Sequence, residues 1–199
     1  MRSYVITIGR EYGSGGRIIG KKLAEMLGIP FYDEELINLM VKETGLASDF
    51  IKNVENRRPL SFFYDTSFSY ENLPVEDQVS ASESDIVRKV ADNGPCVIVG
   101  LCADYVLRHK ENCIRVFIHA PKEDRVKRVK EVYKVNEKNI EKYVHKTDKS
   151  RAVYYNYQTD RKWSRAQNYD LVINSNLGLD TAVKIIKDVV DIKESEYIG

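Results

Sequence analysis

The chain has 199 residues, of which 43% are hydrophobic and 31% are charged, and its formal net charge at pH 7 is +1. This length suits a single domain with a sizeable buried core, so we expect residues 1–199 to form one unit. The balanced charge gives no general reason to expect nucleic-acid binding, and no apolar stretch is long enough for a signal peptide or a membrane span.

The opening segment, residues 4–22, reads YVITIGREYGSGGRIIGKK. Its β-branched run predicts a strand at 4–8, and apolar residues at helical spacing before Gly28 predict a helix at 16–27. Strand, glycine-rich loop and helix together are typical of a phosphate-binding loop, because glycines and a helix start present N–H donors to an anion. The loop residues expected to hold a nucleotide are Gly9, Arg10, Glu11, Tyr12, Gly13, Ser14, Gly15, Gly16, Arg17 and Ile18. A closely packed turn without a ligand is the alternative.

The loop departs from the common pattern, which ends in Gly-Lys-Ser/Thr. Here Gly16 is followed by Arg17, which is a candidate to replace the lysine because guanidinium binds phosphate well. Ser14 carries the only aliphatic hydroxyl in the loop. Glu11 should repel phosphate unless it coordinates magnesium or pairs with an arginine. The metal candidates are therefore Ser14 or Glu11.

The next segment combines a short strand at 30–32 with Asp33 and a predicted helix at 34–44. Asp33 is a good N-cap, and it could instead orient a nucleotide or magnesium. The aromatic segment 59–73 could cover an acceptor, bury in a homodimer interface or pack in the core. A helix is predicted at 76–93.

The apolar run 96–99, which ends at Gly100, predicts a buried parallel strand. A helical stretch is expected at 101–109, and further strands at 114–119 and 171–173, each followed by a helical pattern. The sequence therefore predicts an α/β fold with a five-stranded parallel sheet flanked by helices. Ligands of such sheets bind at the carboxyl ends of the strands.

The three cysteines, Cys96, Cys102 and Cys113, have spacings that match no metal motif. All three lie in or beside apolar runs, so we expect reduced and mostly buried thiols. Reduced thiols favour a cytoplasmic location.

Residues 107–165 hold 17 Lys and Arg against 8 Asp and Glu, which indicates an anionic ligand or a solvated helical face. Arg125 and Arg128 follow a strand end and share one helix face, where they could contact phosphate, stack on a base or lie in solvent. A long polar helix is predicted at 136–157. Asp148, Arg151 and Arg161 lie in or near this helix, together with several aromatic residues. Such a segment suits a helical lid that closes on a polyphosphate, or an exposed helical hairpin.

The chain as a whole resembles the cytidylate kinase-like family, a branch of the P-loop nucleoside monophosphate kinases. The blocks that carry the resemblance are ITIGREYGSGGRIIGKKLAEMLGIPFYDEELI, VIVGLCADYVL, RVFIHAPKEDRVKRV, DKSRAVYYNYQTDRKW and YDLVINSNLGLD. They span nearly the whole chain in the family's order. The loop REYGSGGR and the later lysine-, arginine- and tyrosine-rich block are the most specific of them.

The resemblance implies a P-loop kinase that uses ATP and Mg²⁺ to phosphorylate a nucleoside monophosphate, with CMP or dCMP as first choice. It implies an acceptor-binding region at 33–93 and a helical lid at 125–165. The expected catalytic residues are Arg17, in place of the loop lysine, and Arg125, Arg128, Asp148 and Arg151. The expected acceptor-binding residues are Asp33, Gly100, Asp104 and Arg161. Partners are then small molecules, with no nucleic acid and no membrane, and a homodimer through 59–73 is a further hypothesis.

One position departs from the family pattern, which has Gly-Arg after the third strand where this chain has Gly100 and Leu101. The family arginine is expected to hold the acceptor phosphate, and leucine cannot. Arg57, Arg58 or Arg88 could compensate, or the chain could phosphorylate another small acceptor. A nucleotide-binding sensor or interaction protein without catalysis is the third hypothesis.

Overall fold

The computed structural model describes residues 4–37 and 75–196. Its centre is a five-stranded sheet in the order β2-β3-β1-β4-β5. All four strand pairings are parallel. The strands are β1 (Val5–Arg10), β2 (Phe31–Asp33), β3 (Cys96–Val99), β4 (Cys113–His119) and β5 (Leu171–Asn174). The predicted α/β fold with a five-stranded parallel sheet is confirmed.

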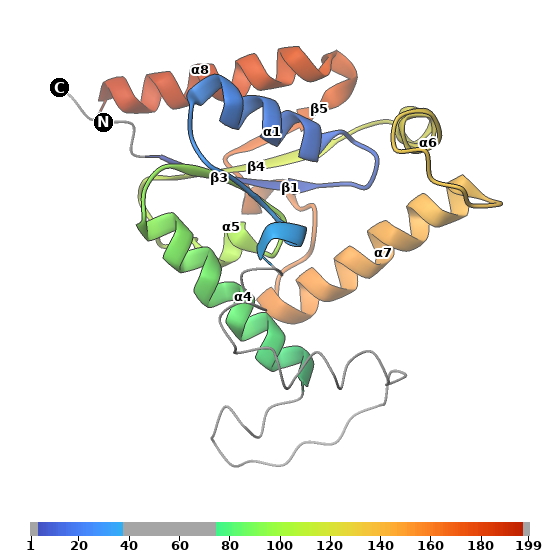
Figure 1. Ribbon diagram of the computed structural model, residues 1–199, viewed down its shortest axis with the longest axis horizontal. Helices are drawn as coiled ribbons and strands as arrows, with labels where there is room; N and C mark the ends of the chain where they lie inside the picture. Colours follow the sequence, from blue (N-terminus) through green and yellow to red (C-terminus); the bar gives the residue numbers. More distant parts are fainter. Residues whose placement is uncertain (1–3, 38–74, 197–199) are drawn as a thin grey trace.

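Helices cover both faces of this sheet (Figure 1). Helices α1 (Gly16–Leu27) and α8 (Leu179–Glu196) pack on one face, and α4 (Val75–Asp92) and α5 (Ala103–Val106) pack on the other. The strands supply both cores by alternation, because successive side chains of a strand point to opposite faces. In β3, Val97 faces the α1 side and Ile98 faces the α4 side, and both are fully buried.

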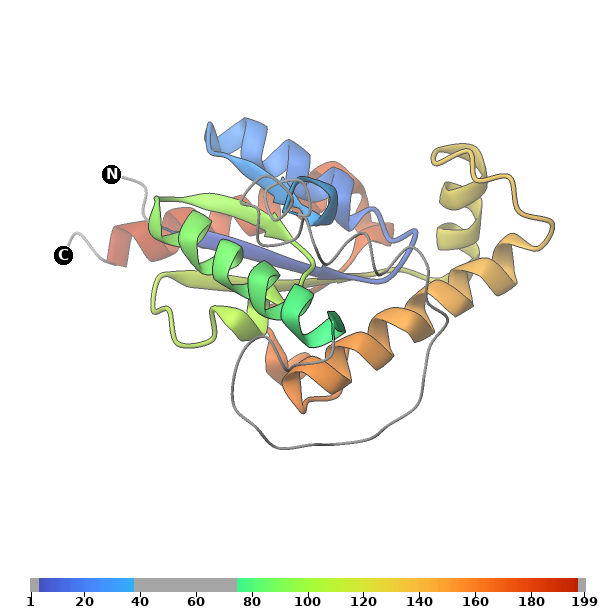
Figure 2. The ribbon, with the colours of Figure 1, turned by 60° about the horizontal axis from the view of Figure 1, so that its bottom comes forward.

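Two further helices, α6 (Lys122–Glu131) and α7 (Ile140–Thr159), lie apart from both cores. Helix α7 runs obliquely from α6 back toward α4 (Figures 1 and 2). Its start is capped by the Asn139 side chain, which accepts the Lys142 N–H at 2.8 Å. Two short 3₁₀ turns, η2 (Ala166–Asn168) and η3 (Ser175–Leu177), flank β5.

The region after β3 differs from the predicted helix at 101–109, because only Ala103–Val106 is α-helical. Three successive residues before it have positive φ: Gly100 at 90°, Leu101 at 58° and Cys102 at 50°. A left-handed conformation at non-glycine residues is costly, by roughly 1–2 kcal/mol each, and is not encoded in hydrophobic spacing. The tight turn shortens the helix from its N-terminal side.

Several predictions from the sequence lie wholly or partly outside the described residues. Residues 34–37 are helical, but the rest of the predicted helix at 34–44 and the aromatic segment 59–73 fall in the undescribed range. Within residues 4–37 and 75–196, no helix combines the length and apolarity that crossing a membrane requires.

Candidate functional site

The glycine-rich loop connects β1 to α1 at the carboxyl edge of the sheet. Gly15, with φ of 86°, immediately precedes the helix and serves as its N-cap. Gly13 lies against α6: a Cβ at this position would sit 2.7 Å from the backbone oxygen of Arg125. Only glycine permits that approach at a φ of 80°. The loop is therefore packed against α6 rather than standing free in solvent.

Glu11 is held by α6 and the residue before it. Its Oε2 accepts the Ala120 N–H at 3.1 Å and lies 3.3 Å from Nε of Arg125. Of the two explanations for a carboxylate in this loop, the arginine pair is the one observed. The same Arg125 also forms an ion pair with Asp148 of α7. One guanidinium thus joins the loop, α6 and α7.

Helices α6 and α7 both bond the loop backbone. Arg125 Nη1 donates to the carbonyl of Tyr12 at 3.1 Å, and Arg128 Nη1 donates to the carbonyl of Gly13 at 2.6 Å. Asp148 Oδ1 accepts the Tyr12 N–H at 2.7 Å. The two arginines, which the sequence predicted to contact phosphate, stack on a base or lie in solvent, both donate to loop carbonyls.

Arg17 lies outside this cluster. Its Nε donates to Asp33 Oδ2 at 2.7 Å and its Nη2 donates to Glu35 Oε2 at 2.9 Å. Its side chain is 60% exposed. Asp33 Oδ1 accepts the Leu36 N–H at 3.1 Å, as an N-cap does. Arg17 and Asp33 therefore tie the start of α1 to the end of β2.

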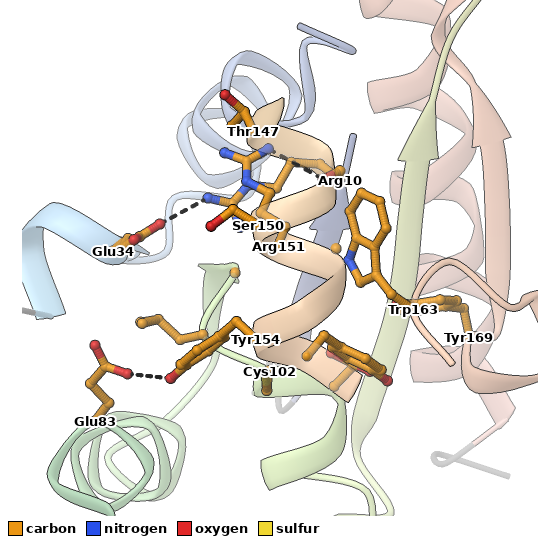
Figure 3. Close-up of a pocket in the computed structure, with 15 residues that line it drawn as sticks. Arg10, Glu34, Glu83, Cys102, Thr147, Ser150, Arg151, Tyr154, Trp163 and Tyr169 are labelled. Carbon is orange, nitrogen blue, oxygen red and sulfur yellow. Dashed lines mark hydrogen bonds and ion pairs between the residues drawn. The ribbon is translucent and has the colours of Figure 1, made fainter. Parts of the chain in front are cut away.

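A pocket of about 400 Å³ opens beside the loop, between the carboxyl ends of β1 and β3 and helix α7 (Figure 3). Fifteen residues line it: Gly9, Arg10, Glu34, Glu83, Gly100, Leu101, Cys102, Asp104, Thr147, Ser150, Arg151, Tyr154, Tyr155, Trp163 and Tyr169. Of the sequence-predicted site residues, Gly9, Arg10, Gly100, Asp104 and Arg151 line the pocket. The others do not: residues 11–18, Asp33, Arg125, Arg128, Asp148 and Arg161.

Two arginines meet at one end of this pocket (Figure 3). Arg151 Nη1 donates to the carbonyl of Arg10 at 3.4 Å, and its guanidinium lies over the Tyr12 ring. Burial, together with the charge of Arg10, lowers the pKa of Arg151 to about 10. Arg10 forms an ion pair with Glu34 at 3.3 Å, and that carboxylate is more than half exposed. Two enclosed guanidinium groups side by side favour the binding of an anionic ligand between them.

The other end of the pocket carries carboxylates held by tyrosines. Tyr155 Oη donates to Asp104 at 2.7 Å, and Tyr154 Oη donates to Glu83 at 2.8 Å. Burial raises the pKa of both carboxyl groups, and these hydrogen bonds oppose the rise. Arg161 stays outside, over the Tyr105 ring at 5.1 Å. These acids could accept hydrogen bonds from hydroxyl or amino groups of a ligand.

Several lining residues were missed by sequence reasoning. Three of them, Thr147, Ser150 and Tyr154, share one face of α7 with the predicted Arg151, at i, i+3, i+4, i+7 spacing. That polar stripe is a signal that could have identified the pocket wall. Glu83 lies mid-helix without such a signal. Arg88, one candidate for compensating Leu101, is exposed and pairs with Asp85, while Arg57 and Arg58 lie outside the described residues.

The site has the features that a bound polyphosphate would use. Among the buried side-chain atoms that lack a hydrogen-bond partner in the described part of the chain is Ser14 Oγ of the loop. Tyr169 lines the pocket, and its hydroxyl oxygen lies 3.3 Å from the position a Cβ on Gly9 would take. Ser14 Oγ is a hard oxygen of the kind Mg²⁺ binds, whereas Glu11 is already engaged. These residues fit a nucleotide with its metal.

Comparison with known proteins supports the same reading of the fold. A crystal structure of an uncharacterized protein from Eubacterium ventriosum ATCC 27560 is 31% identical, with a TM-score of 0.73 over 94% of this chain and 98% of the other. A gluconokinase from Sinorhizobium meliloti 1021 is 14% identical, with a TM-score of 0.61 over 99% and 97%. Shikimate kinase from Bacteroides thetaiotaomicron is 13% identical, with a TM-score of 0.56 over 94% and 98%.

The last two similarities concern the fold alone, which is that of P-loop kinases. No curated protein matches the chain significantly. The sequence profile of the cytidylate kinase-like family matches residues 5–177, which include every strand and the loop. The chain therefore belongs to the cytidylate kinase-like family.

Proposed function

We propose that this protein transfers the terminal phosphoryl group of ATP to a nucleoside monophosphate, with CMP and dCMP as first candidates. The observation that carries the proposal is the position of the two-arginine pocket directly beside the glycine-rich loop. A kinase needs an enclosed, positively charged space between donor and acceptor, because phosphoryl transfer is catalysed mainly by positioning and charge.

In this proposal, some residues bind the donor phosphates and the metal, and others position the loop and α7. Residues 9–18 would hold the donor phosphates through backbone N–H groups, and Ser14 would bind the metal. Bound Mg²⁺ would supply charge neutralisation between the phosphates. An oxygen of the acceptor phosphate forms the new bond to phosphorus as the bond to ADP breaks. Arg151 would face the transferred group from α7, and Arg125 holds the loop and α7 together.

The acceptor would occupy the rest of the pocket. Its phosphate would lie at the arginine end, and Glu83 and Asp104 would accept hydrogen bonds from the sugar or the base. Water exclusion by α7 would protect the transfer from hydrolysis.

Leu101 favours a second candidate, a kinase for another small acceptor. It lines the pocket where the family pattern has arginine, and it offers no charge to a phosphate. Three carboxylates, Glu34, Glu83 and Asp104, also line the pocket, and a hydroxyl-rich acceptor would satisfy them. The gluconokinase and shikimate kinase folds are similar to this one, and their names point to hydroxylated acids.

A coupled ATP-consumption assay with Mg²⁺ tests the proposal. The panel contains CMP, dCMP, UMP, AMP and GMP, together with gluconate and shikimate. We expect turnover with CMP or dCMP, and a loss of about 10²-fold or more in kcat for Arg151→Met. Turnover with a hydroxylated acid alone would favour the second candidate. Binding of ATP without turnover on any acceptor would contradict both and favour a nucleotide-binding protein that does not catalyse transfer.

A further inference from the structure

The helix start determines how the loop aligns with the common motif. Helix α1 begins at Gly16, directly after the left-handed Gly15. If Gly15 is the second glycine of G-x-x-x-x-G-K-S/T, then Arg10 occupies the place of the first glycine and Gly16 occupies the place of the lysine. In this register the loop has an arginine where glycine is usual and a glycine where lysine is usual.

These two exchanged positions touch each other. A Cβ added to Gly16 would lie 2.7 Å from Cβ of Arg10 and 3.2 Å from its Cγ. The obstructing atoms are the stem of Arg10, which cannot swing away as the end of a side chain could. An arginine at position 10 therefore requires glycine at position 16, and the lysine of the common motif cannot coexist with it.

The Arg10 stem directs its guanidinium into the pocket (Figure 3). A Cβ on Gly100 would collide with its Nη1, so the guanidinium lies over the end of β3. The side chain is only 16% exposed, and Glu34 is the carboxylate that pairs with it. Arg151 contacts the Arg10 carbonyl from α7. The cation is thus enclosed, next to a second cation, at the loop.

Arg17, the other candidate for the lysine role, has different surroundings. Its guanidinium is 60% exposed, is held by Asp33 and Glu35, and does not line the pocket. Two carboxylates already neutralise it, so a phosphate would have to compete with both.

We propose that Arg10 is the phosphate-binding cation of this loop, supplying from its first position the charge that lysine supplies at the helix start in other P-loops, with Gly16 as its obligatory partner. The ligand class is the outer phosphates of a nucleoside triphosphate. The inference rests on the proposed function.

The first experiment removes the charge and keeps the stem. Arg10→Met retains the packing against Gly16, so the fold should survive, as circular dichroism will show. Inorganic tripolyphosphate binding, measured by calorimetry without any acceptor, should weaken about tenfold or more, as expected for loss of a charge-assisted contact. The kcat of the kinase assay should fall about 10²-fold or more. Arg108→Met, which removes a guanidinium outside the pocket, is the matched control.

The second experiment tests the partnership between the two positions. Arg10→Gly and Gly16→Lys should each lose tripolyphosphate affinity or stability, and the double variant R10G/G16K should bind within about tenfold of the original chain. Unchanged binding in Arg10→Met overturns the inference, as does a larger loss in Arg17→Met. If the original chain binds tripolyphosphate and Arg10→Met does not, but no acceptor is phosphorylated, the inference stands and the proposed function fails.

Discussion

Asp104 is a buried carboxyl group whose ionisation costs folding free energy. It is 5% exposed, and the hydroxyl of Tyr155 donates to it from α7. Burial raises the pKa of its carboxyl group above the ordinary value. Ionisation of Asp104 is thus easier in the unfolded chain than in the folded one, so its charge opposes folding at neutral pH.

Asp104→Asn should remove this cost. A raised folded pKa gives stability that is present below the unfolded pKa and is lost as pH rises through the folded pKa. The unfolding free energy of Asp104→Asn relative to the original chain should therefore increase as pH rises from about 4 to 8, by about 1.4 kcal/mol for each pH unit between the two pKa values. Thermal unfolding across this range measures it, and the exposed Asp188→Asn is the control. Parallel pH profiles would contradict the prediction.

Residue-level roles were the hardest to predict from sequence, and the loop shows why. The spacing of the glycines permits two alignments with the common motif, in which either Gly16 or Gly15 is the second glycine. The observed start of α1 and the Arg10–Gly16 contact favour the alignment through Gly15. Glu11 was predicted either to bind magnesium or to pair with an arginine, and the arginine pair is present. Glu83 gave no signal, because its role depends on Tyr154, 71 residues away.

At the scale of elements, the connection between α6 and α7 is built on Arg125 and Asp148. Both side chains are largely buried, at 11% and 14% exposure, and Asp148 also accepts the Tyr12 N–H of the loop. A second pair, Lys122 with Glu141, joins the same two helices at the surface. The two pairs offer a direct comparison of buried and exposed charge.

Asp148→Ala should destabilise the protein by about 3 kcal/mol, because it removes one of the two carboxylates that pair with the buried Arg125 and also the acceptor of the Tyr12 N–H. Urea unfolding measures this loss. Glu141→Ala is the control and should leave the midpoint nearly unchanged, since exposed ion pairs contribute little. The double variant R125M/D148L should recover part of the loss, because it removes the buried Arg125 charge together with its Asp148 partner and leaves Glu11 with the Ala120 N–H as donor. Equal effects of the two single variants would refute this account of the connection.

Helices and strands were predicted accurately where the hydrophobic pattern of the sequence is strong. The helix at 16–27 and the strand at 96–99 match the structure residue for residue. Glycines mark the ends, the helix has apolar residues at helical spacing, and the strand is apolar throughout. The helix at 101–109 was overestimated, because left-handed Leu101 and Cys102 have no signature in composition. The polar helix predicted at 136–157 begins instead at Ile140, after the Asn139 cap.

At the scale of the whole molecule, α7 is a long helix that buries few of its residues. Its buried residues are Val144, Tyr155 and Thr159, in a helix of 20 residues. Local opening of such a helix costs less free energy than opening of the sheet. A segment of this kind suits a lid, since it can close on a ligand that supplies the missing contacts.

Hydrogen exchange tests the lid. Amides of residues 136–163 should become more protected when ATP and acceptor are present together than with either alone. The amides of α8, which packs against the sheet, provide the internal control and should not change. Unchanged exchange across 136–163 with both ligands bound would rule out a lid in this segment.

The contact between Arg10 and Gly16 also limits which substitutions the loop can accept during evolution. A lysine at position 16 has no room beside the Arg10 stem. With Arg10 as the proposed cation, glycine at both positions would leave the loop without that charge, so either exchange made alone should lower activity. Relatives that keep this loop should carry Arg10 and Gly16 together. A motif search that requires the P-loop lysine would miss these relatives.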